Sequence, residues 1–139
     1  MNKYILVAAT LLTMFAAGCG RLFEGTPAMM YESLNVKLGS LPDDTRVYFG
    51  HEYTAANLRF AAAVEPHNED VKQKAERVHK LRERGEFTTP STIGDERRTN
   101  PFMRCESPEV VEHVRGEVGA EAAPVAVLGA IRAKKDTFK

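Results

Sequence analysis

Four histidines are the residues of this chain best suited to bind a metal ion or to transfer a proton. They are His51, His67, His79 and His113, and no two of them lie within four positions of each other. Without an HxH or HExxH pair, neighbouring histidines on one element cannot form a metal site. His51 differs because it follows a glycine at the end of a predicted strand, where functional side chains of layered α/β proteins often project. The residues alone leave two interpretations of His51 open, a metal ligand or a polar residue at a strand end.

Other kinds of reaction are disfavoured by what the chain lacks. No serine lies in a nucleophile-elbow sequence, and no glycine-rich loop with a lysine precedes a helix. Serine-triad hydrolysis and nucleotide binding are therefore not expected. The basic residues near the C-terminus have two interpretations, binding of a small carboxylate or simple preference of cations for the last turn of a helix. These residues are Arg132, Lys134, Lys135 and Lys139.

Length and charge limit the classes of partner. A chain of 139 residues suits one compact unit. Nineteen basic residues balance nineteen acidic ones, so no overall field attracts nucleic acid or an anionic membrane. Cys19 and Cys105 are far apart and form no CxxC pair, so neither a zinc site nor a structural disulfide is expected from them.

The N-terminal stretch MNKYILVAATLLTMFAAGC also has two interpretations. One lysine, an apolar run and small residues before Cys19 resemble a secretory signal, and in particular a bacterial lipoprotein signal. The alternative is a buried strand or strand pair. The apolar run is shorter than the ~20 residues of a membrane-spanning helix. We predict a cytoplasmic protein, with a lipoprotein anchored to a membrane through Cys19 as the alternative.

The remaining pattern predicts mainly helices, joined by short loops and one short strand. Thr26 and Pro27 begin a helix that ends at Gly39, and residues 46–49 form a strand. Further helices are predicted from Thr54 to Pro66, from Asn68 to Gly85, from Ser107 through Val118, and from Pro124. The charged residues of the 68–85 helix are interpreted as a solvated face. Residues 88–102 are predicted to be extended, with one helical turn after Thr92.

Several motifs, in one order and spacing, resemble a known enzyme family. They are GCGRLFEGT, LPDDTRVYFGHEYT, NLRFA, VEP, PSTIGDE, NPFMR and IRAKKDTFK. Over residues 13–139 the chain is similar to hydroxyacylglutathione hydrolase, or glyoxalase II, of the metallo-β-lactamase superfamily. The resemblance implies an α+β fold, the C-terminal part of an αβ/βα metallo-β-lactamase sandwich followed by a mostly α-helical glutathione-binding domain. The expected boundaries are an apolar segment at 1–18, the sandwich part at 19–53 and the helical domain at 54–139.

The resemblance also implies an activity and a set of site residues. The family hydrolyses the thioester S-lactoylglutathione to D-lactate and glutathione, in methylglyoxal detoxification, with two metal ions that are zinc, iron or manganese. By motif, His51 would be a metal ligand. Glutathione contacts would fall on Arg21, Phe23, His51, Tyr53, Arg132 and Lys135.

Departures from the family pattern change the expected activity. The THxHxDH motif is absent from these residues, Leu12 stands where the bridging aspartate belongs, and Phe23 stands where many members have tyrosine. One histidine cannot hold two metal ions, so we expect a truncated chain that binds glutathione or its thioesters but does not hydrolyse them alone. The alternatives are a non-enzymatic glutathione-binding or scaffold module, and a misplaced start of a complete enzyme.

Losing half a sandwich would also leave apolar surface uncovered. We expect such surface on the strand at residues 46–49 and beneath the first helix, which favours association. The expected partner is a second copy of the chain or a fragment that carries the N-terminal half.

Overall fold

The structure is a computed structural model, and it describes residues 4–6, 14–22 and 25–139. The predicted N-terminal segment of residues 1–18 is therefore described only in part, and Leu12 and Phe23 lie outside the described residues. The strands are β1 (Tyr4–Leu6), β2 (Met14–Phe15), β3 (Gly18–Cys19), β4 (Arg46–Tyr48) and β5 (Ser91–Thr92). The helices are α1 (Pro27–Tyr31), the π-helix η1 (Glu32–Leu38), α2 (Thr54–Val64), α3 (Glu69–Glu83), α4 (Ile93–Thr99), the 3-10 helix η2 (Pro101–Met103), α5 (Pro108–His113), α6 (Arg115–Val118) and α7 (Pro124–Thr137).

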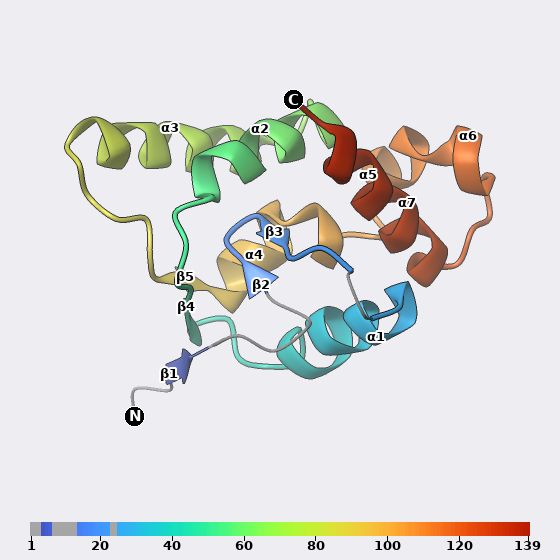
Figure 1. Ribbon diagram of the computed structural model, residues 1–139, viewed down its shortest axis with the longest axis horizontal. Helices are drawn as coiled ribbons and strands as arrows, with labels where there is room; N and C mark the ends of the chain where they lie inside the picture. The colour runs from blue at the N-terminus through green and yellow to red at the C-terminus, as the bar shows by residue number, and fades with distance from the viewer. Residues whose placement is uncertain (1–3, 7–13, 23–24) are drawn as a thin grey trace.

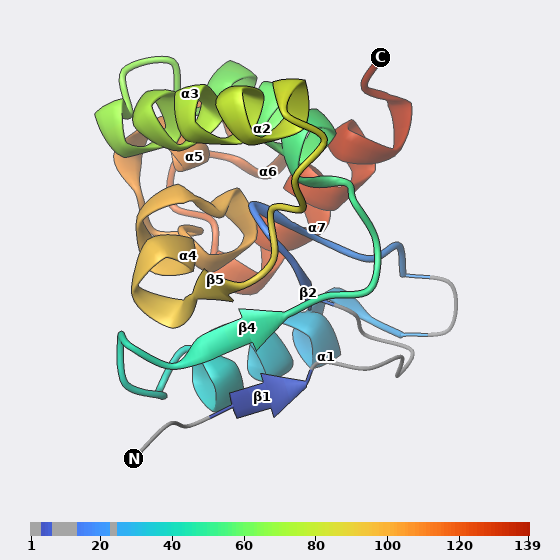
Figure 2. The same cartoon turned by 90° about the vertical axis from the view of Figure 1, so that its left-hand side faces the viewer.

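The described elements form an α-rich fold with two small sheets (Figure 1). Helices α2 and α3 pack side by side over α4, while β4 and β1 lie on the other side of α4 with α1 behind them (Figure 2). In the first sheet β1 runs parallel to β4, and β4 runs antiparallel to β5. The second sheet is the β2–β3 hairpin, residues 14–19, which lies between α2, α4 and α7.

The predicted helix starts at Thr26 and Asn68 are confirmed, and both capping side chains make the expected bonds. The hydroxyl of Thr26 accepts the N–H of Met29 at 3.2 Å, and Asn68 Oδ1 accepts the N–H of Val71 at 3.3 Å. Each of these bonds satisfies one N–H that the first turn of a helix leaves unpaired. The predicted strand at residues 46–49 is also confirmed, as β4.

Two predicted elements differ from the structure. The single turn expected after Thr92 is the seven-residue helix α4, because the Thr92 hydroxyl accepts the N–H of Asp95 at 3.2 Å and acidic residues occupy the first turn. The helix predicted from Ser107 through Val118 is divided into α5 and α6. The division falls at Val114, whose φ of −114° and ψ of 9° lie outside the helical range.

The buried apolar side chains of the described residues form two clusters, and the smaller one joins Ala17 of the hairpin to α2 and α3. One cluster of buried side chains includes Met14 of the hairpin, Met30 of α1, Val47 of β4, Phe102 of η2 and Ile131 of α7. Val47 is only 1% exposed, so the expectation of uncovered apolar surface on strand β4 is wrong. In α1 and η1, Met30 and Leu34 are buried against α7 and η2, whereas Met29 and Val36 are 50% and 56% exposed.

No helix among the described residues combines the length and apolar character needed to cross a bilayer.

Candidate functional site

Three aromatic rings meet where the β2–β3 hairpin approaches the start of α2. The ring of His51 stacks on that of Tyr53, with centroids 5.1 Å apart and planes at 16°. Phe15 meets both rings edge-on, with its centroid 5.9 Å from that of His51 and 5.3 Å from that of Tyr53. Tyr53 is 49% exposed and His51 is exposed, so this cluster offers ring faces and polar atoms to a ligand.

Glu52, between the two stacked residues, fixes the segment that carries them. Its carboxylate accepts the backbone N–H of Thr88 at 2.7 Å and the Thr88 hydroxyl at 2.8 Å. The Thr88 hydroxyl in turn lies 2.7 Å from that of Thr54, the first residue of α2. Glu52 is therefore hydrogen-bonded to the segment that follows α3, while His51 and Tyr53 lie together on the side that faces the β2–β3 hairpin.

A buried carboxylate holds the centre of the hairpin. Glu96 of α4 is fully buried, and its Oε2 accepts the N–H of Ala17 at 2.9 Å. Ala17 has φ = 56°, a conformation that costs a residue with a Cβ about 1 kcal/mol. The other oxygen of Glu96 accepts bonds from Lys74 Nζ at 2.6 Å and from the Ser91 hydroxyl at 2.7 Å.

Two asparagines hold the neighbouring carbonyl groups of the hairpin. Asn57 of α2 donates to the carbonyl of Ala16 at 3.1 Å, and Asn100 donates to that of Gly18 at 3.1 Å. Asn100 also donates to Glu96 at 2.9 Å, so the bonds form one network. Side chains from the helices therefore set the hairpin conformation, and with it the position of Phe15.

Positive charges border the other end of the hairpin. Arg132 of α7 is buried, and its Nη1 donates to the carbonyl of Cys19 at 2.7 Å. Asp136 Oδ1 lies 2.8 Å from Arg132 Nη2 and 3.7 Å from Nε of the exposed Arg21. The Lys135 ammonium lies 5.6 Å from the centroid of the Phe60 ring. Burial, and after it the charges of Arg132 and Arg59, lowers the pKa of Lys135.

The predicted site residues thus fall into two groups on either side of one hairpin. His51 and Tyr53 join Phe15 at its start, while Arg21, Arg132 and Lys135 lie near its end. Phe23 lies outside the described residues. An aromatic cluster and partly exposed cations are suited to an anionic organic ligand.

The residues present do not fit a dinuclear metal site. Within residues 4–6, 14–22 and 25–139, no group of three or more His, Cys, Asp or Glu side chains is arranged to hold a metal ion. His51 has aromatic neighbours rather than other ligand-type side chains. A stable zinc site requires three or four protein ligands, so His51 alone does not provide one.

Both thiols are buried and free in the described structure. Burial raises the pKa of Cys19 to about 11, although the nearby Arg132 charge opposes the shift. Burial also raises the pKa of Cys105, to about 12. Both thiols are therefore protonated at neutral pH and poorly reactive in the folded chain.

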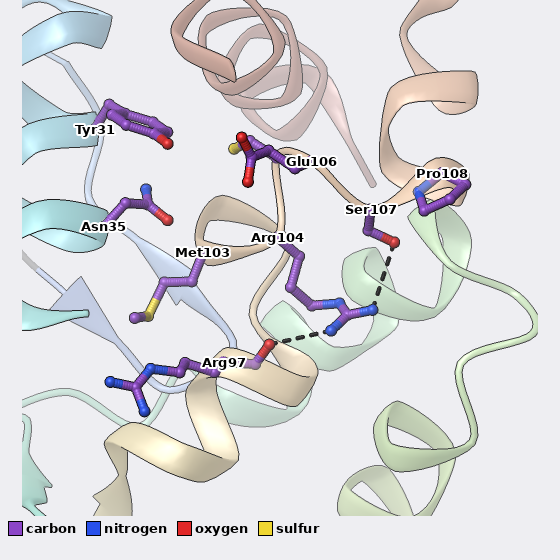
Figure 3. Close-up of a pocket in the computed structure, with 9 residues that line it drawn as sticks. Tyr31, Asn35, Arg97, Met103, Arg104, Glu106, Ser107 and Pro108 are labelled. Carbon is purple, nitrogen blue, oxygen red and sulfur yellow. Dashed lines mark hydrogen bonds between the residues drawn. The ribbon is translucent and has the colours of Figure 1, made fainter. Parts of the chain in front are cut away.

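A separate cavity of about 280 Å³ lies between η1 and the segment that joins η2 to α5 (Figure 3). The cationic side chains that line it are already paired. Arg104 bonds to both carboxylate oxygens of Glu65 at 2.7 and 3.0 Å, and Arg97 bonds to Asp43 and to backbone carbonyls. None of the site residues predicted from the sequence lines this cavity. The paired side chains around this cavity connect neighbouring elements, and their charges are not available to a ligand.

The residues that hold the hairpin were not among the site residues predicted from the sequence. Asn57 and Lys74 lie on the buried stripes of α2 and α3, at helical spacing from apolar residues. A polar residue on such a buried stripe indicates that its side chain pairs with another buried polar group. Glu96 and Asn100 gave no comparable signal, because α4 was predicted as a single turn.

The fold and the site define a class, a helix-rich domain in which one hairpin lies between a cluster of aromatic rings and a group of cations. Residues 52–138 match the family model described as the C-terminus of hydroxyacylglutathione hydrolase. The chain belongs to the hydroxyacylglutathione hydrolase family.

Curated relatives agree with this assignment. The chain is 53% identical over 127 residues to the hydroxyacylglutathione hydrolase of Cupriavidus metallidurans, a match that covers 91% of this chain and 47% of the relative. Identity is 52% over 127 residues with the enzyme of Pseudomonas fluorescens, covering 91% and 49%, and 50% over 127 residues with that of Rhizobium meliloti, covering 91% and 48%. The chain spans about half the length of the curated relatives it matches.

Proposed function

We propose that this chain is the glutathione-recognition part of a hydroxyacylglutathione hydrolase, and that it binds glutathione and its thioesters beside the β2–β3 hairpin. The observation that carries this proposal is the pair of groups flanking the hairpin. The aromatic cluster of Phe15, His51 and Tyr53 lies at its start, and the cations Arg21 and Lys135 lie near its end. Glutathione is an anionic peptide with carboxylates at both ends, and its thioester adds an apolar acyl group, so both kinds of surface have a counterpart in the ligand.

We assign the three-stranded sheet to the sandwich part of the family fold. Strands β1, β4 and β5, with α1 and η1, correspond to the last part of an αβ/βα sandwich, and the chain from α2 onward corresponds to the helical domain. His51 follows β4 directly, and its proposed family role is as one metal ligand. Since the described residues do not fit a dinuclear site, we expect the chain alone to bind thioesters of glutathione without hydrolysing them.

Calorimetric titration with S-methylglutathione tests the proposed site. Tyr53→Ala should weaken binding by about three- to tenfold, because it removes the stacking partner of His51 and one exposed ring of the cluster. His67→Ala is the matched control, since it also removes an exposed ring but lies near Glu109 of α5. It should leave the affinity unchanged.

Two results would contradict the proposal. One is the absence of any binding heat at millimolar ligand with the folded chain, and the other is an equal loss of affinity in both variants. A separate assay follows hydrolysis of S-lactoylglutathione with added zinc, iron or manganese. We expect the rate to equal that of the metal salt alone, and a protein-dependent rate would contradict the expected lack of activity.

A further inference from the structure

A groove of about 360 Å³ runs between α2 and α3, the two helices that lie side by side in Figure 2. Its floor is the outer side of the smaller apolar cluster, in which Leu58 and Val78 are only 2% and 5% exposed. Small side chains on both helices leave the space between them open. The apolar residues that line the groove are Ala55, Leu58, Ala62, Ala75 and Val78.

Three basic side chains border this apolar surface, and no acidic side chain among the described residues lines it. Two of them, on α3, already have partners. His79 Nε2 lies 3.2 Å from a carboxylate oxygen of Glu83, and Arg82 donates to the carbonyl of Glu86 at 2.9 Å. The third is Arg59 of α2, which is exposed and has no hydrogen bond or ion pair within the described part of the chain. Its guanidinium can bind a carboxylate without losing a protein partner.

The charge and the size of the groove both limit what it can bind. A second copy of the chain is disfavoured, because a symmetric contact through this groove would bring two cationic borders together. Ala55 and Ala62 are seven positions apart on α2, so the groove is about 10 Å long. An apolar floor of this length, with one unpaired cation beside it, complements an alkyl chain that ends in an anionic group.

We propose that the groove between α2 and α3 binds a medium-chain carboxylate, with the alkyl chain on the apolar floor and the carboxylate on Arg59. Binding removes the floor and the alkyl chain from water, and the charge-assisted bonds to Arg59 fix the orientation of the ligand. None of the predicted glutathione residues lines this groove. The proposal therefore does not rest on the proposed function.

Calorimetric titration of the chain with octanoate tests the proposed site, together with two-dimensional ¹H–¹⁵N NMR to locate the ligand. We expect saturable binding at a single site, with the largest amide shifts at Leu58, Ala62 and Ala75. Hexanoate should bind about fivefold more weakly than octanoate, because two fewer methylene groups are removed from water. Saturating S-methylglutathione should leave the affinity for octanoate unchanged, because the two sites share no residue.

Substitutions separate the two halves of the site. Arg59→Gln should weaken octanoate binding about five- to tenfold, because the carboxylate loses its charged donor. Arg77→Gln is the matched control, since it removes an exposed arginine of α3 that lies 3.4 Å from Asp95 and outside the groove. It should leave the affinity unchanged. Ala75→Leu should weaken binding about tenfold or more, because the larger side chain fills the groove, and Ala62→Leu replaces it if that variant does not fold by circular dichroism.

Several results would overturn the proposal. They are the absence of saturable octanoate binding to the folded chain, equal losses in Arg59→Gln and Arg77→Gln, and an unchanged affinity in a folded Ala75→Leu chain. Competition between octanoate and S-methylglutathione would place octanoate beside the hairpin instead. A dimer in sedimentation that octanoate dissociates would assign the groove to a second copy of the chain. If octanoate binds as expected and S-methylglutathione does not bind, the proposed function is wrong and the groove site stands.

Discussion

At the scale of single residues, the buried ion pair of Lys74 and Glu96 supports the β2–β3 hairpin. Lys74 is only 4% exposed, although its helix reads as a solvated, charged segment. Its ammonium bonds to Glu96 at 2.6 Å, to Asp95 at 2.9 Å and to the Ser91 and Thr99 hydroxyls at 3.2 Å. The expectation that the charged residues of this helix form a solvated face is therefore wrong for Lys74. The lysine neutralises the carboxylate that holds Ala17.

Lys74→Met should lower the free energy of unfolding by about 3 kcal/mol, because it leaves the Glu96 charge buried with only neutral donors. Lys72→Met is the control on the same helix, since Lys72 pairs with Glu69 at 3.5 Å on the exposed surface. It should cost at most about 1 kcal/mol. Urea unfolding measures both values. Adding Glu96→Gln to Lys74→Met should recover part of the loss, and equal losses for Lys74→Met and Lys72→Met would contradict the assigned role.

At the scale of elements, the fit of the β2–β3 hairpin against α2 decides where the aromatic cluster lies. A Cβ on Gly18 would lie 2.7 Å from Asn57 Nδ2, closer than real side-chain contacts allow. Glycine is therefore required at this position to let the hairpin approach the helix. The same asparagine holds the carbonyl of Ala16, so a displacement of its side chain would also break that bond.

Gly18→Ala should lower the thermal stability, with a loss of about 1–3 kcal/mol from the forced displacement of Asn57. Gly116→Ala is the comparison, because a Cβ at Gly116 in α6 meets no atom within 4 Å. That change should raise the stability by about 0.5–1 kcal/mol through helix propensity. Calorimetric unfolding of the two variants checks the sign of each effect, and an equally stable Gly18→Ala chain would show that the close approach does not matter.

Some features of the elements could be predicted from the sequence, and others could not. Helix starts at Thr26 and Asn68 were predictable because capping depends on neighbouring residues. A strand pair was one of the alternatives for the N-terminal stretch, but the conformation of the hairpin was not predictable, since it depends on Glu96, which is 79 positions from the Ala17 that it holds. The family resemblance implied that His51 and Tyr53 belong to one site, but the addition of Phe15 required the fold.

At the scale of the whole molecule, the core and the site depend on the same segment. The hairpin contributes Met14 to the main core and Phe15 to the aromatic cluster, and its backbone is held by α2, α4 and α7. Site residues from distant parts of the chain therefore keep their positions only when the whole described fold is intact. The cavity between η1 and the segment before α5 lies apart from these residues and has its own paired charges (Figure 3).

Binding of a glutathione ligand beside the hairpin can be tested by two-dimensional ¹H–¹⁵N NMR of the chain with added S-methylglutathione. We expect saturable shifts in the amide signals of Phe15, Arg21, His51, Tyr53 and Lys135, with the signals around the cavity of Figure 3 unchanged. Shifts centred on Tyr31, Asn35 and Glu106 instead, or no shifts at millimolar ligand with the folded chain, would contradict it.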